Sequence, residues 1–279
     1  MSLQLVAKLI DEITSSKFPW EVKTIQVGEN GDALFHPQLL LILRLIKEKA
    51  PSIKVNLATN MINMNMGLSK AILKEGLLSS LQLNIDGHDK ETYEAQKKLS
   101  YKKVMENLKT FMRMRSEINP NFSIGINVLT LSQYYDHTMK RFGQPPLRSP
   151  DLVPFSNYKK VYDSLREKEW ISSDVHIRKS PTFFWAEREM DIQFPDLSSY
   201  QCPQLPRIEN EAFISPRGHW YACCLDANQD LVLGNIWKQT LIEIYESKER
   251  KNFIQNLKDK KFENIGYPCD RVPFCGVMA

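Results

Sequence analysis

The stretch VKTIQVGENGDALFHP, residues 22–37, decides the fold because it contains a strand, a turn and a helix start in direct succession. Val22–Val27 is typical of a short strand, and the glycine-containing residues 28–32 are typical of a turn. Pro37 then marks the first turn of a helix that we expect to end at Lys49. A strand followed at once by a helix is the first part of a βαβ unit.

The same order recurs along the first half of the chain. The other expected elements are a helix at 2–15, strands at 53–58, 80–85 and 122–130, and helices at 69–75 and 101–115. Such alternation predicts an α/β fold with a parallel sheet, either a barrel or an open doubly wound sheet. The alternation fades after about residue 131, where a proline-rich segment at 141–156 follows.

Polar and glycine residues gather where the expected strands end. In both kinds of parallel sheet, ligands bind at the carboxyl ends of the strands. These ends carry Gly28–Asp32, Thr59-Asn60, Asn84 with Asp86-Gly87, and Asn127. Four such ends in succession indicate a ligand site, although polar strand ends also occur in scaffolds that bind no ligand.

The composition is that of an ordinary globular protein. Apolar residues make up 42% of the 279 residues and charged residues 25%, with a formal net charge of +4. No basic block interleaved with aromatic residues occurs, so we do not expect nucleic-acid binding. The N-terminal residues lack the pattern of a signal peptide, and no apolar run approaches the about 20 residues that cross a bilayer. We therefore expect a cytoplasmic protein without a membrane segment, whose cysteines bind metal or do chemistry.

The cysteines are confined to the end of the chain, at positions 202, 223, 224, 269 and 275. Residues 211–215 and 219–223 predict a β-hairpin with Gly218 in its turn, and its second strand brings Cys223 back toward Cys202. Four thiolates in two pairs can hold an iron–sulfur cluster or a zinc ion. Buried thiols without a metal are the remaining alternative.

The hairpin and its surroundings resemble a known module. The matching features are Cys202-Pro203, FISPRGHWYACCLD at 213–226, LGNI at 233–236, LIEIY at 241–245 and the final Cys269 and Cys275. Together they resemble the SPASM or twitch extension of radical S-adenosylmethionine (SAM) enzymes. The resemblance implies one auxiliary 4Fe–4S cluster.

The resemblance also implies the ligands of that cluster, which are Cys202, Cys223, Cys269 and Cys275. Cys224 stands apart because five residues, not four, separate it from the hairpin glycine. Neighbouring residues of a strand also face opposite ways. We therefore expect Cys224 to be a buried thiol or a substitute ligand.

The strand ends resemble the SAM-binding motifs of the same family. Val27–Pro37 resembles the motif whose backbone and acidic group hold the amino group of SAM, which requires carbonyls and a carboxylate. Leu57–Asn60 resembles "Thr-Asn-Gly", and Leu83–Gly87 resembles "Ser-Ile-Asp-Gly". Asp32 replaces a glutamate, Met61 a glycine and Asn84 a serine. The implied SAM-binding residues are Gly28, Asn30, Gly31, Asp32, Thr59, Asn60, Asn84 and Asp86.

One feature of the family is missing from these residues. Its catalytic cluster is held by three cysteines in the loop after the first barrel strand, whereas this sequence has no cysteine before Cys202. We expect a truncated or split enzyme, with the three-cysteine loop on a missing N-terminal segment or on a partner chain. The alternative is a degenerate homologue that kept the fold and lost the radical chemistry.

The resemblance implies a division of the chain into three parts. Residues 1–140 are expected to form a partial β/α barrel without its first strand, residues 141–200 the rest of the barrel and a linker, and residues 201–279 a small α+β SPASM or twitch domain. The implied activity is modification of a peptide, protein or small molecule by a 5′-deoxyadenosyl radical. The alternatives are a catalytically inactive binding scaffold and a zinc-stabilised structural module.

Overall fold

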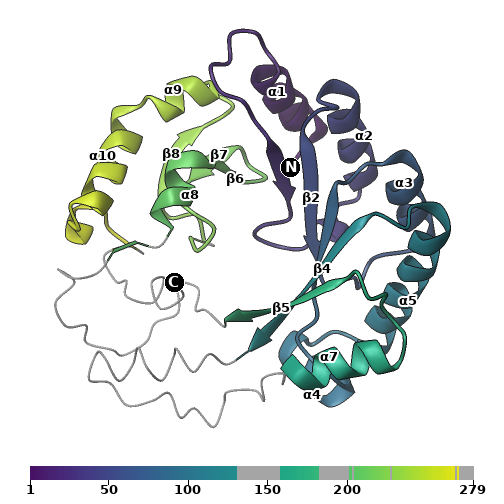
Figure 1. Ribbon diagram of the computed structural model, residues 1–279. Coiled ribbons are helices and arrows are strands. Elements are labelled where there is room, and N and C mark those ends of the chain that lie inside the picture. Colours follow the sequence, from purple (N-terminus) through teal and green to yellow (C-terminus); the bar gives the residue numbers. More distant parts are fainter. Residues whose placement is uncertain (131–157, 182–200, 203, 227, 268, 270–279) are drawn as a thin grey trace, which may run out of the picture. The chain divides into compact units, whose positions relative to one another are not determined.

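The computed structural model describes residues 1–130, 158–181, 201–202, 204–226, 228–267 and 269 (Figure 1). These residues fall into two compact units. The sheet unit contains Trp20–Thr130 and Tyr158–Pro181, and the cysteine unit contains Met1–Pro19 and the described residues from Gln201 onward. No helix in the described ranges has the length and apolar character needed to span a membrane.

The sheet unit is built on a five-stranded parallel sheet. Its strands are β1 (Thr24–Val27), β2 (Lys54–Thr59), β3 (Ser80–Asn84), β4 (Ser123–Thr130) and β5 (His176–Pro181). Each strand pairs with its successor along the chain. A doubly wound sheet would reverse this order at a switch point, so the strand order is that of the barrel alternative.

Helices connect the strands, and Figure 1 shows them along one side of the sheet. They are α2 (Leu39–Lys49), α3 (Met66–Glu75), α4 (Lys90–Lys97), α5 (Tyr101–Ile118) and α7 (Tyr158–Glu167), with the 3₁₀ turn η1 (Ala33–Phe35) after β1. Local signals set their ends. The Asn65 side chain accepts the Leu68 N–H at the start of α3, and Gly76 ends that helix at a φ of 61°.

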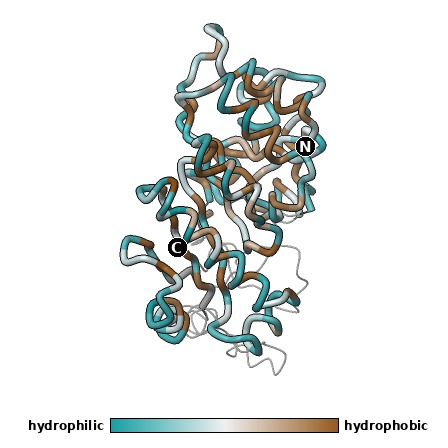
Figure 2. Tube along the Cα trace, turned by 90° about the vertical axis from the view of Figure 1, so that its right-hand side faces the viewer, coloured by the Kyte–Doolittle hydropathy of each residue, from teal (hydrophilic) through white to brown (hydrophobic). Residues whose placement is uncertain are grey.

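Side chains alternate between the two faces of the sheet. Val55 and Leu57 of β2 and Leu81 and Leu83 of β3 are buried, whereas the residues between them are partly exposed. Figure 2 colours each residue by its hydropathy and shows apolar and polar residues interspersed along the chain. The apolar face forms the core beneath the helices, and the other face carries polar side chains such as Gln82.

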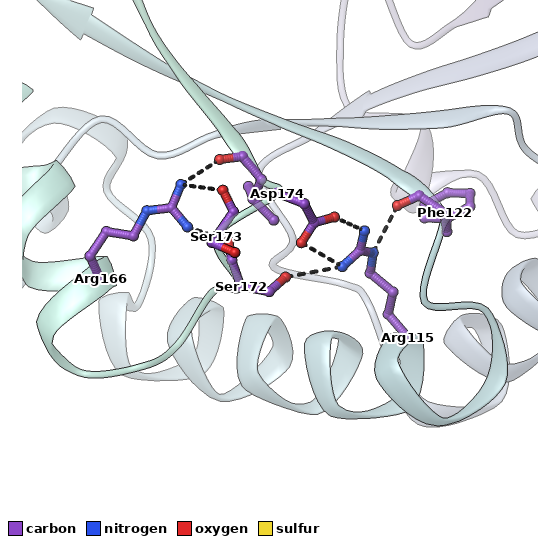
Figure 3. A network of polar contacts seen from close by, with 7 residues as sticks. Arg115, Phe122, Arg166, Ser172, Ser173 and Asp174 are labelled. Atoms are coloured by element: carbon purple, nitrogen blue, oxygen red, sulfur yellow. Dashed lines mark hydrogen bonds and ion pairs between the residues drawn. The ribbon is translucent and has the colours of Figure 1, made fainter.

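A buried arginine fixes the loop before β5 to helix α5 (Figure 3). Arg115 is 4% exposed and donates to the Phe122 carbonyl at 2.7 Å, to Ser172 Oγ at 3.0 Å and to the Asp174 carboxylate. Arg166 of α7 donates to backbone carbonyls of the same loop. The loop therefore reaches β5 already ordered by two guanidinium groups.

The cysteine unit holds a three-stranded antiparallel sheet in the order β6-β7-β8. Its elements are α1 (Leu3–Ile13), α8 (Leu205–Asn210), β6 (Phe213–Ile214), β7 (His219–Tyr221), β8 (Val232–Asn235), α9 (Leu241–Tyr245), α10 (Lys248–Lys258) and η3 (Phe262–Asn264). The predicted hairpin is confirmed, with Gly218 in its turn at a φ of +86°. Added bulk at Gly218 would meet the Trp237 ring at 2.9 Å.

Helix α1 packs in the cysteine unit, although residues 1–140 were assigned together to the barrel. Leu5 is fully buried in a cluster with Trp220 and Ile236. Lys8 donates to the Ile236 carbonyl, and Glu12 accepts the backbone N–H of Leu241. The apolar stripe of α1 thus finds its partner more than 200 residues away, which position along the sequence does not indicate.

Candidate functional site

Cys202 lies just before helix α8 and is mostly buried. Its carbonyl accepts the Leu205 N–H at 3.2 Å. Burial raises the pKa of the Cys202 thiol, and the nearby backbone N–H groups of Gln204 and Leu205 partly oppose the rise. The start of α8 therefore places backbone donors near this sulfur atom.

Cys223 follows β7 in a tight turn, in which the Asp226 N–H donates to the Cys223 carbonyl at 3.1 Å. The backbone N–H groups of Leu225 and Asp226 lie near its sulfur and act to lower its pKa. Burial raises the pKa of this thiol to about 11. The buried Asp226 carboxylate accepts two further N–H groups at 2.9 and 3.0 Å, from Asp230 and Leu231, which holds the turn in shape.

Cys224 lies in the same turn and not in a strand, because β7 ends at Tyr221. Cys223 and Cys224 therefore need not face opposite ways, as neighbouring residues of a strand would. The Cys224 sulfur accepts a hydrogen bond from Arg207 Nη1 at 3.1 Å, and its thiol donates to Gln204 Oε1 at 3.7 Å.

The four described cysteines gather at one small hydrophobic core. Cys223 belongs to this core, and Cys202, Cys224 and Cys269 pack against it. None of the four is in a disulfide. Cys275, the other predicted ligand, lies outside the described residues. The other buried members of the core are Leu205, Ile208, Phe213, Tyr221, Ala222, Leu225, Phe253, Leu257 and Phe262.

The donor atoms around this core suit an iron–sulfur cluster by type and location. Thiolates are the usual ligands of such clusters, and hydrogen bonds to the sulfur atoms are one of the means by which proteins stabilise them. Backbone N–H groups reach the sulfurs of both Cys202 and Cys223. Within the described part of the chain, no group of three His, Cys, Asp or Glu side chains lies close enough to hold a single metal ion.

In the sheet unit, the Asp32 side chain ties the end of β1 to the end of β2. Asp32 Oδ1 accepts the Leu34 N–H at 2.9 Å, and Oδ2 accepts the Thr59 hydroxyl at 2.8 Å and the Asn60 N–H at 2.8 Å. Its carboxylate is thus engaged within the protein. Gly28 and Gly31 in the same loop adopt φ values of +88° and +120°, which favour glycine.

Met61 stands where the resemblance has a glycine, and its backbone has a φ of 70°. Left-handed backbone is strained in any residue with a side chain. The Asn107 side chain of α5 donates to the carbonyls of Met61 and Ile62 at 2.8 and 3.1 Å and so holds this loop. The backbone shape expected of the glycine is therefore present, with a buried methionine in its place.

Three neighbouring strands are linked by polar side chains at the level where β3 ends. Asn127 of β4 donates to Asn84 Oδ1 of β3 at 3.3 Å and accepts from Arg178 of β5. The register pairs the same residues, Asn84 with Asn127 and Asn127 with Arg178. Asn84, a predicted SAM-binding residue, therefore lies at the carboxyl end of β3 in a side-chain ladder across three strands.

Asp86 is buried after β3 and pairs with Lys97 of α4 at 2.5 Å. An added Cβ at Gly87 would lie 2.4 Å from the Tyr93 Cα, so only glycine allows α4 to approach so closely. Burial raises the pKa of the fully buried Tyr93, and the charges of Asp86 and Asp32 add to the rise. Sequence reasoning missed Tyr93 and Lys97, because it treated residues after Gly87 as outside the motif.

Comparison with known proteins finds a family match for the cysteine unit and similar solved structures for nearly the whole chain. Residues 202–271 match the model of the SPASM family, an iron–sulfur cluster-binding domain. No curated protein matches the chain significantly. Among solved structures, the fold is similar to that of anSMEcpe with bound AdoMet and Cp18Cys peptide (TM-score 0.58, 14% identity, covering 99% of this chain and 80% of that one). It is also similar to that of SuiB from Streptococcus suis (TM-score 0.52, 13% identity, covering 91% of this chain and 60% of that one).

Proposed function

We propose that this chain, which joins a SPASM iron–sulfur cluster-binding domain to a sheet with the fold of radical SAM enzymes, belongs to an enzyme that modifies a peptide by 5′-deoxyadenosyl radical chemistry. The observation that carries the proposal is the presence of both parts in one chain. A peptide is favoured over a small molecule because the similar anSMEcpe structure contains a peptide together with AdoMet. Since cluster thiols must stay reduced, the cytoplasm is the proposed location.

The auxiliary cluster is proposed to be a 4Fe–4S cluster, which in this family binds the substrate or passes electrons. Cys202, Cys223 and Cys269 supply three thiolates from three separate segments of the cysteine unit. Cys275 is the fourth ligand that the resemblance implies. The backbone N–H groups at the sulfurs of Cys202 and Cys223 reduce the cost of placing negative charge in a buried site.

The SAM site is proposed to lie at the carboxyl ends of β1 to β4. The glycine-rich backbone at Gly28, Asn30 and Gly31 would meet the methionine part of SAM, since an ammonium group needs carbonyl acceptors. Asp32 and Thr59 support this loop through their mutual hydrogen bonds. The remaining proposed contacts are Asn60, Asn84 and Asp86.

The radical step needs three cysteines that these 279 residues do not supply, since none precedes Cys202. We expect no 5′-deoxyadenosine from this chain alone under reducing conditions. A segment or partner chain carrying the cysteine triplet would have to complete the site. The coding DNA upstream of Met1 and the adjacent genes can be searched for such a triplet, and finding none would favour an inactive scaffold instead.

Anaerobic purification with iron, sulfide and zinc analysis tests the cluster directly. We expect about four iron and four sulfide per chain, with the absorption band of a 4Fe–4S cluster. Stoichiometric zinc without sulfide would support the zinc-stabilised structural module and contradict the proposal.

The second candidate is a catalytically inactive scaffold that binds a peptide without cleaving SAM. The observation that favours it is the Asp32 carboxylate, whose oxygens already accept bonds from Leu34, Thr59 and Asn60. Equilibrium dialysis with labelled SAM, on the iron-loaded chain completed by a segment that carries the cysteine triplet, separates the two candidates. Binding of SAM to this complex supports the enzyme, and its absence supports the scaffold.

A further inference from the structure

We infer that Cys224 is a ligand of the auxiliary cluster and that Arg207 holds its sulfur in position. The inference rests on the cluster proposed above and goes beyond the ligand set that the resemblance implies. It departs from that set at the fourth position, where Cys224 takes the place of Cys275.

The backbone allows Cys224 to act beside Cys223. Both residues lie in a turn beyond the end of β7. A hydrogen bond from the Asp226 N–H to the Cys223 carbonyl closes this turn. Cys224 packs against the same core as Cys202 and Cys269. It is also near enough to Cys202 for the charges of the two sulfurs to interact. All four described cysteines are thus within one small region of the cysteine unit.

Arg207 is fixed where it can donate to the Cys224 sulfur. Its Nη1 lies 3.1 Å from that atom, while its Nε and Nη2 donate to the Glu211 carboxylate at 3.0 and 2.7 Å. The guanidinium also lies over the Phe213 ring, 5.1 Å from its centre. Because Glu211 and Phe213 hold the guanidinium, its Nη1 stays aimed at the sulfur. Its positive charge would offset that of a thiolate bound to a cluster.

The segment that matches the family model contains four cysteines. It extends over residues 202–271 and includes Cys202, Cys223, Cys224 and Cys269, whereas Cys275 lies beyond it. A 4Fe–4S cluster with four protein ligands takes four thiolates. The matched segment alone supplies that number.

Alkylation of the iron-loaded chain identifies the ligands without an activity assay. The anaerobically loaded protein is treated with iodoacetamide, and each cysteine is quantified by mass spectrometry. We expect Cys224 to be protected and Cys275 to react, with Cys224 becoming reactive after the iron is removed by a chelator. Alkylation of Cys224 in the loaded chain, with Cys275 protected, would overturn the inference.

Two pairs of variants test the roles separately. C224A should lose most of its iron, whereas C275A should keep the iron content and the electron paramagnetic resonance signal of the reduced wild-type cluster. R207Q should shift the midpoint potential of the cluster to a more negative value, because a positive donor at the sulfur favours the reduced, more negative state. K251Q is the matched control, since it removes a positive charge of the same unit at an exposed ion pair with Glu246 and leaves Arg207 and Glu211 untouched.

The outcomes distinguish this inference from the proposed function. If the wild-type chain takes up no iron and sulfide, the proposed function itself fails. If the wild-type chain loads but C224A keeps the full cluster with an unchanged resonance signal, only the inference about Cys224 fails. An R207Q potential equal to that of the wild type, with C224A depleted of iron, would overturn the role of Arg207.

Discussion

The two units use their polar groups in different ways. At the strand ends of the sheet unit, side chains bond to one another, as Asp32 does with Thr59 and Asn127 with Asn84. In the cysteine unit, backbone N–H groups instead lie near the sulfur atoms of Cys202 and Cys223 and favour their charged form. The first arrangement shapes loops and leaves the backbone to meet a ligand, whereas the second presents the side-chain atoms themselves. A residue in a motif can therefore serve its site by supporting the loop or by touching the ligand.

The largest expected effect lies in the cysteine unit. Cys223→Ser keeps the size of the buried side chain but replaces a soft thiolate by a weak ligand, so we expect loss of nearly all cluster iron. Iron and sulfide analysis after anaerobic loading measures it. The control is Asp32→Asn in the sheet unit, which should leave the iron content unchanged. If Cys223→Ser bound as much iron as the wild type, the Cys223 sulfur would not be a ligand, and the contrast between the two units would fail.

The next effect concerns how closely α4 approaches the end of β3. Gly87→Ala places a Cβ 2.4 Å from the Tyr93 Cα, so the backbone must move. We expect a loss of about 3 kcal/mol in the free energy of unfolding, measured by urea denaturation. Gly67→Ala, in helix α3 with its nearest neighbour 3.4 Å away, should instead gain up to about 1 kcal/mol. Equal effects of the two variants would contradict the close packing at Gly87.

The third prediction tests whether polar side chains in the sheet unit stabilise its fold. Arg115→Met removes a buried guanidinium and leaves the Phe122 carbonyl without its donor. We expect a loss of about 3 kcal/mol in the free energy of unfolding. The control is Arg44→Met, which breaks a more exposed pair with Glu75 and should cost far less. Calorimetric or urea unfolding of both variants provides the test.

The smallest effect is a dependence on pH. Hydrogen bonding to Arg115 lowers the pKa of Asp174 to about 2, below the about 3.9 of an unfolded chain. The resulting stability is fully present above pH about 4 and is lost as the pH falls through 2. Since the Asp174 side chain is 54% exposed, we expect the contribution to be small.

Urea unfolding of Asp174→Asn and the wild type between pH 5 and pH 2 measures this contribution. The variant should be less stable at pH 5, and the difference should shrink toward pH 2. Asp163→Asn, which removes a carboxylate from an ion pair with Lys159, is measured alongside as the matched control. A constant difference for Asp174→Asn would mean that its charge does not stabilise the loop.

The sheet could be predicted from the sequence because its signals are local. The expected strand at 53–58 corresponds to β2, and the expected helix at 101–115 to α5. Helix α4 was missed, since its residues Lys90–Lys97 are mostly polar and show little apolar periodicity. Its start is set by a capping box between Asp89 and Thr92, a local signal that could have located it.

The cysteine site could be predicted only in part. Spacing and resemblance brought Cys202 and Cys223 together, because a hairpin reverses the chain between them. The turn that contains Cys224 could not be predicted, since it depends on where β7 stops and on the side chain of Asp226. The place of α1 could not be predicted either, because its apolar stripe fits any complementary surface regardless of position in the chain.

The packing of α1 against residues 214–245 makes the cysteine unit a discontinuous domain, with the sheet unit inserted between its two parts. During synthesis, the sheet unit can fold before the C-terminal residues that pack against α1 have been made. Closing so long a loop costs little extra entropy once the inserted unit is compact. The proposed cluster can therefore assemble only late in synthesis, after Cys269 has left the ribosome.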